Sequence, residues 1–377
     1  MAEVVAVHQL LPSLHVADAS GSHTLRARDA LRAAGFESEL FVEHVDPPLA
    51  GEAYPARDLD RYVRPGRTVL LYQLAVGSAL VEQILPRKEP VLVNYHNLTP
   101  ASFFWQWAPE WLDAVQLGRR QLVRLAPRVS HAIAVSQFNE RDLIDTGYSS
   151  TSVVPPFVDD RAFAGTPDPD AMARRRAEKE ASGGARWLFV GKLLPHKAAH
   201  DLLKALAMYR RVYDPLAHLV LVGGQPVPAY LAALREFVHA LGLDGAVEFA
   251  GGVSSGELAA CYETADVFVC LSDHEGFCFP LIEAMRCELP VVAYDAGAVS
   301  DTLGTAGILI PDKSPAQVAA AVNRVCTDVT LRQSLILAGR QRLDAFDQQR
   351  TAVQFVQQIR QVLDGLDLST DYGAGHR

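Results

Sequence analysis

Short apolar runs alternate with longer segments of helical periodicity along nearly the whole chain. In the first half this pattern predicts strands at 4–8, 38–42, 68–72, 90–94 and 131–135, and helices at 22–34, 78–85 and 109–125. In the second half it predicts strands at 186–190, 218–222, 246–249, 266–271 and 290–294, and helices at 200–211, 229–241, 255–262, 281–286, 315–327 and 331–346. Strands that are apolar at nearly every position are buried on both faces, which indicates parallel sheets covered by helices. The sequence therefore predicts an α/β fold with two doubly wound, Rossmann-like domains.

The boundary between the two predicted domains lies at a proline-containing stretch. Pro155 and Pro156 cannot continue a helix or a central strand, and a polar segment follows them. We expect an N-terminal domain over residues 1–160 and a C-terminal domain over 161–349. An amphipathic helix is predicted at about 350–366, and residues 367–377 are expected to form a tail. Residues 12–20 are expected to be a loop between the first strand and the first helix.

Composition and charge narrow the class of protein. The chain has 377 residues and a formal net charge of −9, which argues against a nucleic-acid partner because such a partner needs a basic surface. No signal-like start or apolar run of about 20 residues is present, so a cytoplasmic protein with at most peripheral membrane contact is expected. The five cysteines form no Cys-x-x-Cys pair, which favours reduced, buried thiols over a metal cluster.

A pair of glutamates carries the clearest chemical pattern. Glu275 and Glu283 lie eight residues apart, and Pro280 between them suits the first turn of a helix. A loop that leads into a helix N-terminus presents free N–H groups, which favour a phosphate. Carboxylates accept hydrogen bonds from hydroxyl groups. Together these features indicate a sugar nucleotide, whereas the simpler alternative is an ordinary strand–loop–helix with solvated acids.

Cationic side chains follow an earlier strand of the same half. Lys192 and Lys197 come after Gly191, which ends the predicted strand 186–190. Parallel α/β sheets bind ligands at the carboxyl ends of their strands, so two ammonium groups there suit a diphosphate. Solvated surface lysines are the alternative. Gly223 ends the next strand, where a glycine either lets a nucleotide approach the backbone or forms a plain turn.

The N-terminal half places polar residues at corresponding positions. His96 follows the strand 90–94, where a histidine can donate to sugar oxygens or relay a proton. The aromatic run 103–107 suits either stacking on a sugar or core packing. No Gly-x-Gly-x-x-Gly follows the first strand, which counts against a nicotinamide or flavin dinucleotide. The weaker candidates for the acceptor side are Gly21, Ser22, Gln73, Gly77 and Asn97.

These segments resemble retaining glycosyltransferases of family four, which have the GT-B fold with two Rossmann-like domains facing a cleft. The likeness covers nearly the whole chain. The stretch from Glu275 to Met285 is similar to the donor motif of that family. The segment Gly191–Lys197 is similar to its Gly-Arg-x-x-x-x-Lys-Gly motif, but Lys192 replaces the usual Arg and Ala198 replaces the second Gly. The resemblance also implies that the helix at about 350–366 packs back on the N-terminal domain.

The resemblance implies roles for individual residues. Glu275 would contact the donor sugar, Glu283 would hold the ribose diol, and His96 would assist at the sugar face. The implied catalytic residues are His96 and Glu275. The implied donor-binding residues are Gly191, Lys192, Lys197, Gly223, Gly276, Phe277, Cys278, Phe279 and Glu283. Many members of the family have a glycine at the position of Cys278.

The sequence therefore leads to the hypothesis of a retaining, metal-independent, hexosyltransferase-type enzyme. It would move a sugar from a nucleoside diphosphate donor to a hydroxyl of a small-molecule, lipid or glycan acceptor. No cofactor is expected, and the resemblance favours UDP over GDP in the donor. Two alternatives remain open: a GT-B sugar-nucleotide epimerase or phosphorylase, and a non-catalytic sugar-nucleotide binder.

Overall fold

The computed structural model describes residues 6–16, 18–158, 167–224 and 227–366. They form two compact units, each built on one parallel sheet. With the gaps just given, the first unit comprises 6–101, 111–158 and 346–366, and the second comprises 102–110 and 167–345. The expected boundary at residues 160 and 161 and the expected tail at 367–377 lie outside the described residues.

The first unit has a seven-stranded sheet in the order β3-β2-β1-β4-β5-β6-β7, with parallel pairing throughout. Its strands are β1 (Ala6–Leu14), β2 (Leu40–Val45), β3 (Tyr54–Pro55), β4 (Thr68–Leu74), β5 (Val91–Tyr95), β6 (Val129–Ala134) and β7 (Thr151–Val153). Its helices are α1 (Ala19–Ala33), α2 (Leu80–Ile84), α3 (Leu112–Leu125), α4 (Gln137–Thr146) and α14 (Gln348–Gly365). Short 3-10 turns lie at η1 (Pro47–Leu49) and η2 (Ala56–Arg61).

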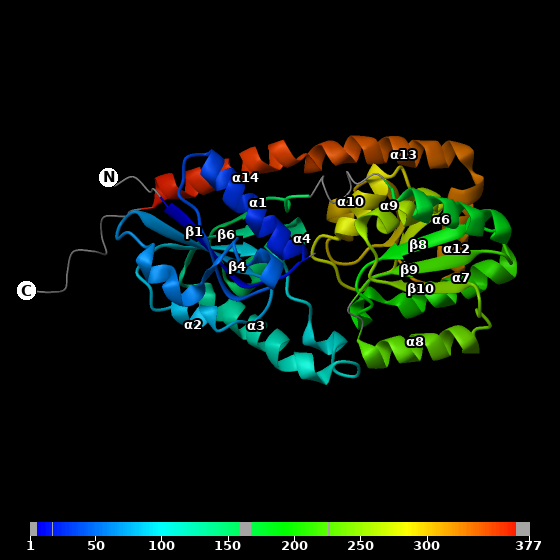
Figure 1. Cartoon of the computed structure of the whole chain (residues 1–377), viewed down its shortest axis with the longest axis horizontal. Coiled ribbons are helices and arrows are strands. Elements are labelled where there is room, and N and C mark those ends of the chain that lie inside the picture. The colour runs from blue at the N-terminus through cyan, green and yellow to red at the C-terminus, as the bar shows by residue number, and fades with distance from the viewer. Residues whose placement is uncertain (1–5, 17, 159–166, 225–226, 367–377) are drawn as a thin grey trace, which may run out of the picture. The chain divides into compact units, whose positions relative to one another are not determined.

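Alternating side chains of the first sheet pack against different helices. Val69 and Leu71 of β4 face one way and join a core with α1 and α14, which lie side by side in Figure 1. Leu70 and Tyr72 face the other way and join a core with α2 and α3. Because successive strand residues point to opposite faces, this continuously apolar strand is buried on both sides. The helix predicted at about 350–366 is α14, and its apolar face completes the core of the first unit.

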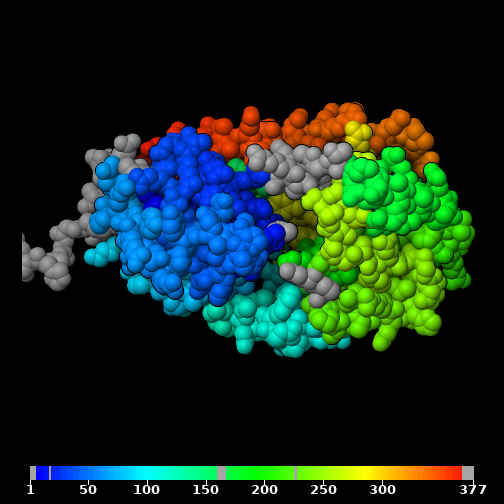
Figure 2. Space-filling view, in the orientation of Figure 1, coloured from blue at the N-terminus to red at the C-terminus, as the bar shows by residue number. Residues whose placement is uncertain are grey.

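The second unit has a six-stranded parallel sheet in the order β10-β9-β8-β11-β12-β13. Its strands are β8 (Arg186–Val190), β9 (His218–Val222), β10 (Val247–Gly251), β11 (Val267–Cys270), β12 (Val291–Tyr294) and β13 (Gly307–Ile310). Its helices are α6 (Pro169–Ser182), α7 (Ala199–Val212), α8 (Pro228–Ala240), α9 (Ser255–Thr264), α10 (Phe279–Arg286), α11 (Val299–Leu303), α12 (Pro315–Thr327) and α13 (Val329–Leu343). Its 3-10 turns include η5 (Pro195–Lys197). Three further 3-10 turns lie at or near points where the chain changes units: η3 (Ala101–Phe103), η4 (Pro109–Trp111) and η6 (Asp344–Phe346). The outer surfaces of α6 and α8 are visible in Figure 2.

Helices cover both faces of the second sheet as well. Trp187 of β8 packs edge-on against Tyr209 of α7, with ring centroids 5.2 Å apart. Phe268 of β11 stacks on Tyr262 of α9 at 6.0 Å. Trp187 pairs with Val267 in the ladder, one residue before Phe268, so these two large side chains point to opposite faces. The second sheet is therefore doubly covered too, and the predicted α/β class with two Rossmann-like domains is confirmed.

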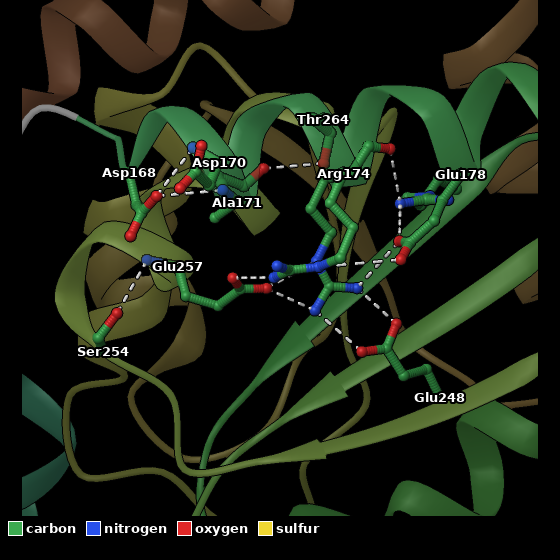
Figure 3. A network of polar contacts seen from close by, with 12 residues as sticks. Asp168, Asp170, Ala171, Arg174, Glu178, Glu248, Ser254, Glu257 and Thr264 are labelled. Carbon is green, nitrogen blue, oxygen red and sulfur yellow. Dashed lines mark hydrogen bonds and ion pairs between the residues drawn. The ribbon is translucent and has the colours of Figure 1, made fainter.

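A charged cluster fastens α6 to the rest of the second unit (Figure 3). Arg175 lies only 4% exposed and pairs with Glu248 of β10 at 2.5 and 2.9 Å. The same guanidinium pairs with Glu257 of α9 at 2.8 Å, and Arg174 reaches Glu257 from the outer side. Asp168 caps the helix by accepting from the backbone of Asp170 and Ala171. The contacts bind α6 to two other elements across some 70 to 80 residues of sequence.

Some predicted elements need correction. Residues 12–20 do not form one loop, because β1 continues to Leu14 and α1 begins at Ala19. Pairing of β1 with β4 ends at Leu10, whereas pairing with β2 continues to Leu14, so Pro12 lies where one edge of the strand is open. The helix predicted at 109–125 is divided into η4 and α3. No helix in the described part of the chain is long and apolar enough to span a membrane.

Candidate functional site

The main polar site of the second unit lies where the strand order reverses, between β8 and β11. Loops that leave adjacent strands in opposite directions at such a point form a crevice at their carboxyl ends. The loop after β8 carries Lys192 and Lys197, and the loop after β11 carries Glu275. The sheet topology therefore brings together residues that the sequence placed about 80 positions apart.

Lys197 and Glu275 form a bidentate ion pair at this point. The Lys197 Nζ atom lies 2.8 Å from Oε1 and 2.7 Å from Oε2 of Glu275, whose residue is 6% exposed. Burial lowers the pKa of Lys197, but the attraction of Glu275 outweighs it and the pKa is raised. The Lys197 ammonium is therefore charged at neutral pH. Lys192 lies exposed at the start of the same loop.

A second lysine ties down the loop that carries Glu275. Lys313 donates to Asp273 at 2.5 Å and lies 2.6 Å from a carboxylate oxygen of Asp201, in the first turn of α7. Burial lowers the pKa of Lys313, but these two carboxylates raise it overall. The three residues link the start of α7 with two loops, and Lys313 lies more than 100 positions from Asp201, so nothing in the local sequence pattern signals them. Sequence reasoning missed this cluster for that reason.

The loop between Glu275 and α10 is held on its other side by α11 and the residues before it. The Ala298 N–H donates to the Glu275 carbonyl at 2.8 Å. Thr302 donates through its hydroxyl to the Phe277 carbonyl. Cys278 caps α10 with a φ of 71°, a left-handed value that favours glycine. Gly276, Phe277, Cys278 and Phe279 thus form a tightly held turn that ends at the N-terminus of α10.

Glu283 faces α9 from the second half of α10. The Tyr262 hydroxyl donates to Glu283 Oε2 at 2.7 Å. Burial raises the pKa of Glu283 to about 7, although the hydrogen bond from Tyr262 opposes this shift. Its carboxyl group is therefore poised to change charge near neutral pH. The structure does not bring it into the Lys197–Glu275 ion pair.

Two of the candidate glycines have a packing reason. A Cβ atom on Gly223 would come within 1.9 Å of the Gly191 carbonyl, so the turns after β8 and β9 require a glycine there. A Cβ atom on Gly77 would come within 2.6 Å of the backbone of α3. Both positions are explained by close contact within the chain itself. A ligand contact at Gly223 or Gly77 stays a prediction.

The first unit has its own pocket at the corresponding reversal, between β1 and β4. This hollow of about 210 Å³ is lined by Leu11, Pro12, Ser13, His15, Asp18, Ser20, Ala75 and Val76. Gly21 and Ser22 are not among these residues, since both lie in α1, where Gly21 donates to the capping Asp18 carboxylate. Sequence reasoning missed the polar residues of this lining, which are Ser13, His15, Asp18 and Ser20. The signal that could have found Asp18 is its place as an N-cap residue before an apolar helix.

His96 lies beside this reversal in a network of buried amides. Its Nε2 atom is 2.7 Å from Gln73 Oε1, and Gln73 also bonds to Gln9 and Asn94. Burial lowers the pKa of His96 to about 4, although the charge of Asp18 opposes the shift. The imidazole is therefore neutral near pH 7. Gln73 is fully buried, so it holds His96, and it does not line the pocket.

Asn97, the residue after His96, has a φ of 93°. Asparagine is one of the few residues besides glycine that tolerates this region. The left-handed residue turns the chain sharply as it leaves β5. Its predicted role on the acceptor side stays a prediction.

Residues 172–342 match the family model described as Glycosyl transferases group 1. This region contains Lys192, Lys197, Glu275 and Glu283. The predicted likeness to glycosyltransferases is thus confirmed for this part of the second unit, while membership of family four stays a prediction.

Curated relatives carry names of the same class. The chain is 31% identical over 288 residues to a D-inositol 3-phosphate glycosyltransferase of Kineococcus radiotolerans, which covers 72% of this chain and 64% of the relative. It is 33% identical over 206 residues to a GDP-mannose-dependent alpha-(1-6)-phosphatidylinositol monomannoside mannosyltransferase of Mycobacterium tuberculosis, which covers 52% of each. The matches therefore span about half to two thirds of the length of these relatives.

Solved structures show the fold over nearly the whole chain. Sucrose-phosphate synthase from Thermosynechococcus elongatus matches with a TM-score of 0.73 at 21% identity, over 96% of this chain and 100% of the other. The Anabaena protein HepE, in complex with UDP and glucose, matches with a TM-score of 0.73 at 20% identity over the same shares. The predicted GT-B class is confirmed by these likenesses, which at such identity concern the fold alone.

Proposed function

We propose that this protein is a retaining glycosyltransferase of the family-four type. It transfers a sugar from a nucleoside diphosphate donor to an acceptor hydroxyl. The bond between the anomeric carbon and the diphosphate oxygen breaks, the acceptor oxygen takes its place, and the hydroxyl proton leaves with the diphosphate. The observation that carries the proposal is the bidentate Lys197–Glu275 pair at the strand reversal of the second unit.

The second unit is the proposed donor side. Lys192 is exposed at the carboxyl edge, where its ammonium group suits a diphosphate. The Glu275 carboxylate has lone pairs beyond those used by Lys197, so it can accept from sugar hydroxyls. Glu283 is the proposed ribose contact. The donor is a UDP- or GDP-sugar, since HepE was solved with UDP and glucose and the mycobacterial relative is named as dependent on GDP-mannose.

The first unit is the proposed acceptor side. Its pocket offers Asp18, His15 and two serines to a polyhydroxylated molecule. The neutral His96 can accept or donate a hydrogen bond without adding charge. The names of the curated relatives suggest an inositol phosphate or a phosphatidylinositol mannoside as acceptor. No residue at the proposed donor site is assigned to a metal, because the Lys197 ammonium already neutralises Glu275.

The proposal is tested by incubating the protein with UDP-, GDP- and ADP-sugars, with and without inositol phosphates, and by detecting products by mass spectrometry. We expect release of one nucleoside diphosphate together with a glycosylated acceptor. Donor consumption without that product would support an epimerase or phosphorylase instead. Failure of every donor to be bound or cleaved would overturn the proposal.

Glu275→Gln removes the charge that pairs with Lys197 and keeps the shape of the side chain. We expect kcat/KM to fall by about 100-fold or more, which is typical when a preorganised polar contact at a reacting centre is lost. The matched control is Glu288→Gln, since Glu288 lies exposed just after α10 and pairs only across the surface with Arg340. Undiminished activity of Glu275→Gln, or an equal loss in Glu288→Gln, would contradict the site assignment.

A further inference from the structure

Two buried cysteines lie against each other at the ends of the loop that carries Glu275. Cys270 is the last residue of β11, and Cys278 caps α10. Their sulfur atoms are 3.9 Å apart, and the residues are 1% and 7% exposed. A disulfide has a sulfur–sulfur length of about 2.05 Å, so closing this pair needs a local shift and no change of fold.

The backbone at Cys278 indicates that this side chain is not there for packing alone. A φ of 71° is unfavourable for an L-residue with a Cβ atom, and glycine avoids that cost. In this conformation the Cys278 sulfur lies 3.9 Å from the Cys270 sulfur. Such an outlier in a binding loop is a reason to look for a function of the side chain.

The surroundings favour ionisation of one sulfur of the pair. The hydrogen bond from Cys278 lowers the pKa of Cys270, and the same bond raises the pKa of Cys278. The charge of Lys197 lowers the pKa of Cys278, whereas burial and the charge of Glu275 raise the pKa of both thiols, so the contact between the sulfurs is what favours a thiolate at Cys270. A thiolate is the form that reacts with peroxides.

We propose that Cys270 and Cys278 form an oxidation site, at which a hydroperoxide converts the two thiols to a disulfide. One thiolate attacks a peroxide oxygen and becomes a sulfenic acid, while the other peroxide oxygen leaves and takes up a proton as water or alcohol. The second thiol then attacks that sulfur, and the sulfenic oxygen leaves as water. Two thiols lose two electrons in total, and the hydroperoxide is reduced by the same two.

The disulfide would move the loop that carries Glu275. Cys270 is paired with Ala293 in the sheet ladder, so the approach of the sulfurs falls mainly on Cys278 and the turn before α10. The Thr302 hydroxyl donates to the Phe277 carbonyl and the Ala298 N–H donates to the Glu275 carbonyl, and these two hydrogen bonds hold the turn. Moving it disturbs the contact of Glu275 with Lys197. This consequence rests on the proposed function, under which oxidation weakens donor binding.

The site is tested on the full-length protein with hydrogen peroxide, thiol blocking and digestion after glutamate. Cleavage after Glu263, Glu275 and Glu283 places Cys270 in peptide 264–275 and Cys278 in peptide 276–283. We expect these two peptides to remain joined after oxidation and to separate after dithiothreitol. Oxidation of both cysteines without a joined peptide, or no reaction at peroxide levels that oxidise the methionines, would overturn the proposal.

Variants connect the cross-link to binding. Cys270→Ala removes the partner in β11, and Cys261→Ala is the matched control because Cys261 is equally buried but lies in α9. We expect peroxide to raise the nucleotide Kd of the unaltered protein and of Cys261→Ala reversibly, by about tenfold or more, since a shift of about 1 Å in a site is costly. The nucleotide Kd of Cys270→Ala should not change with peroxide. An equal, reversible rise in the Kd of Cys270→Ala would overturn the proposal that the disulfide weakens nucleotide binding.

The two proposals fail in different ways. If no nucleotide binds, the proposed function fails, but the joined peptide still tests the oxidation site. If a nucleotide binds and no joined peptide forms, the oxidation site alone is refuted.

Discussion

Glu283 shows how burial can set the charge of a single side chain. Its pKa is raised to about 7 because its carboxyl group is buried against Tyr262. In the unfolded chain a glutamate has a pKa of about 4.3. Between these two values the folded protein holds a proton that the unfolded chain has lost. The contribution to stability is therefore full below the lower pKa and disappears as the pH rises through about 7.

Glu283→Gln should remove the part of the pH dependence of stability that comes from this carboxyl group. We expect the free energy of unfolding of the unaltered protein to fall, relative to that of the variant, as the pH rises from about 4.5 to about 7. Urea titrations at several pH values measure the free energy of unfolding, and Glu288→Gln serves as the exposed control. Parallel curves for the unaltered protein and Glu283→Gln would show that this carboxyl group titrates normally.

The sequence predicted some members of the site better than others. Lys197 and Glu275 each follow an apolar run, so strand ends could be recognised locally, and the structure places them within 2.7 Å. Lys313 and Asp201 could not be found in this way, because their contact depends on how the start of α7 meets a distant loop. The pairing of Gln73 with His96 was missed for a related reason, since a buried glutamine in a strand resembles a ligand contact.

Helix α6 depends on charged contacts more than on a wide apolar face. Arg175→Met should lower the free energy of unfolding by about 2 kcal/mol or more, because several charge-assisted hydrogen bonds are lost and two glutamates remain close together. Arg174→Met is the matched control, since this neighbouring side chain is about half exposed and surface pairs contribute about 0–1 kcal/mol. Equal effects of the two variants in urea unfolding would contradict this view of the cluster.

Helix α14 depends on packing instead. Phe355 is fully buried in the core it shares with α1, so Phe355→Ala should cost about 3–5 kcal/mol. Val353 lies on the same helix with 55% exposure, and Val353→Ala should change stability by about 0.5 kcal/mol at most. Thermal unfolding of both variants measures the difference. A small effect at Phe355 would mean that α14 is not part of the folded core.

Element types were predicted more reliably than element ends. The apolar runs that became β4, β5 and β12 are uniform, so periodicity identified them. The end of β1 was misplaced because Pro12 normally breaks a strand, and only the pairing with β2 explains why it is tolerated. Helix α6 was not predicted at all, since its polar composition gives a weak periodic signal.

At the scale of the whole molecule, nucleotide binding is expected to act on one unit. Hydrogen exchange with saturating UDP or GDP should show protection at 191–197 and 271–279, which are loops at the carboxyl edge of the second sheet. Bound ligand stabilises the state that binds it by mass action. Residues 11–20 of the first unit serve as the internal comparison. Protection confined to those residues would reverse the assignment of the donor side.

Two doubly wound units were visible in the sequence, because alternation of strands and helices is a long-range pattern that survives local errors. The sequence did not show which segments belong to each unit. The segment 102–110 interrupts the first unit in sequence yet packs with the second, where Phe104 is 3% exposed and its ring lies 5.8 Å from that of His196. The aromatic run 103–107 did not show which of its rings would be buried or in which core, since Phe104 is buried while Trp105 is 73% exposed.

That segment limits how the chain can be divided or recombined. A gene cut at a single point near residue 160 would supply the second unit without residues 102–110, and would leave His196 without the rings of Phe103 and Phe104. Chimaeras that exchange the second unit between related proteins therefore need two grafted pieces, one of them only nine residues long. The second unit, which is the proposed donor side, is thus discontinuous in the sequence, although it is a single compact unit in the fold.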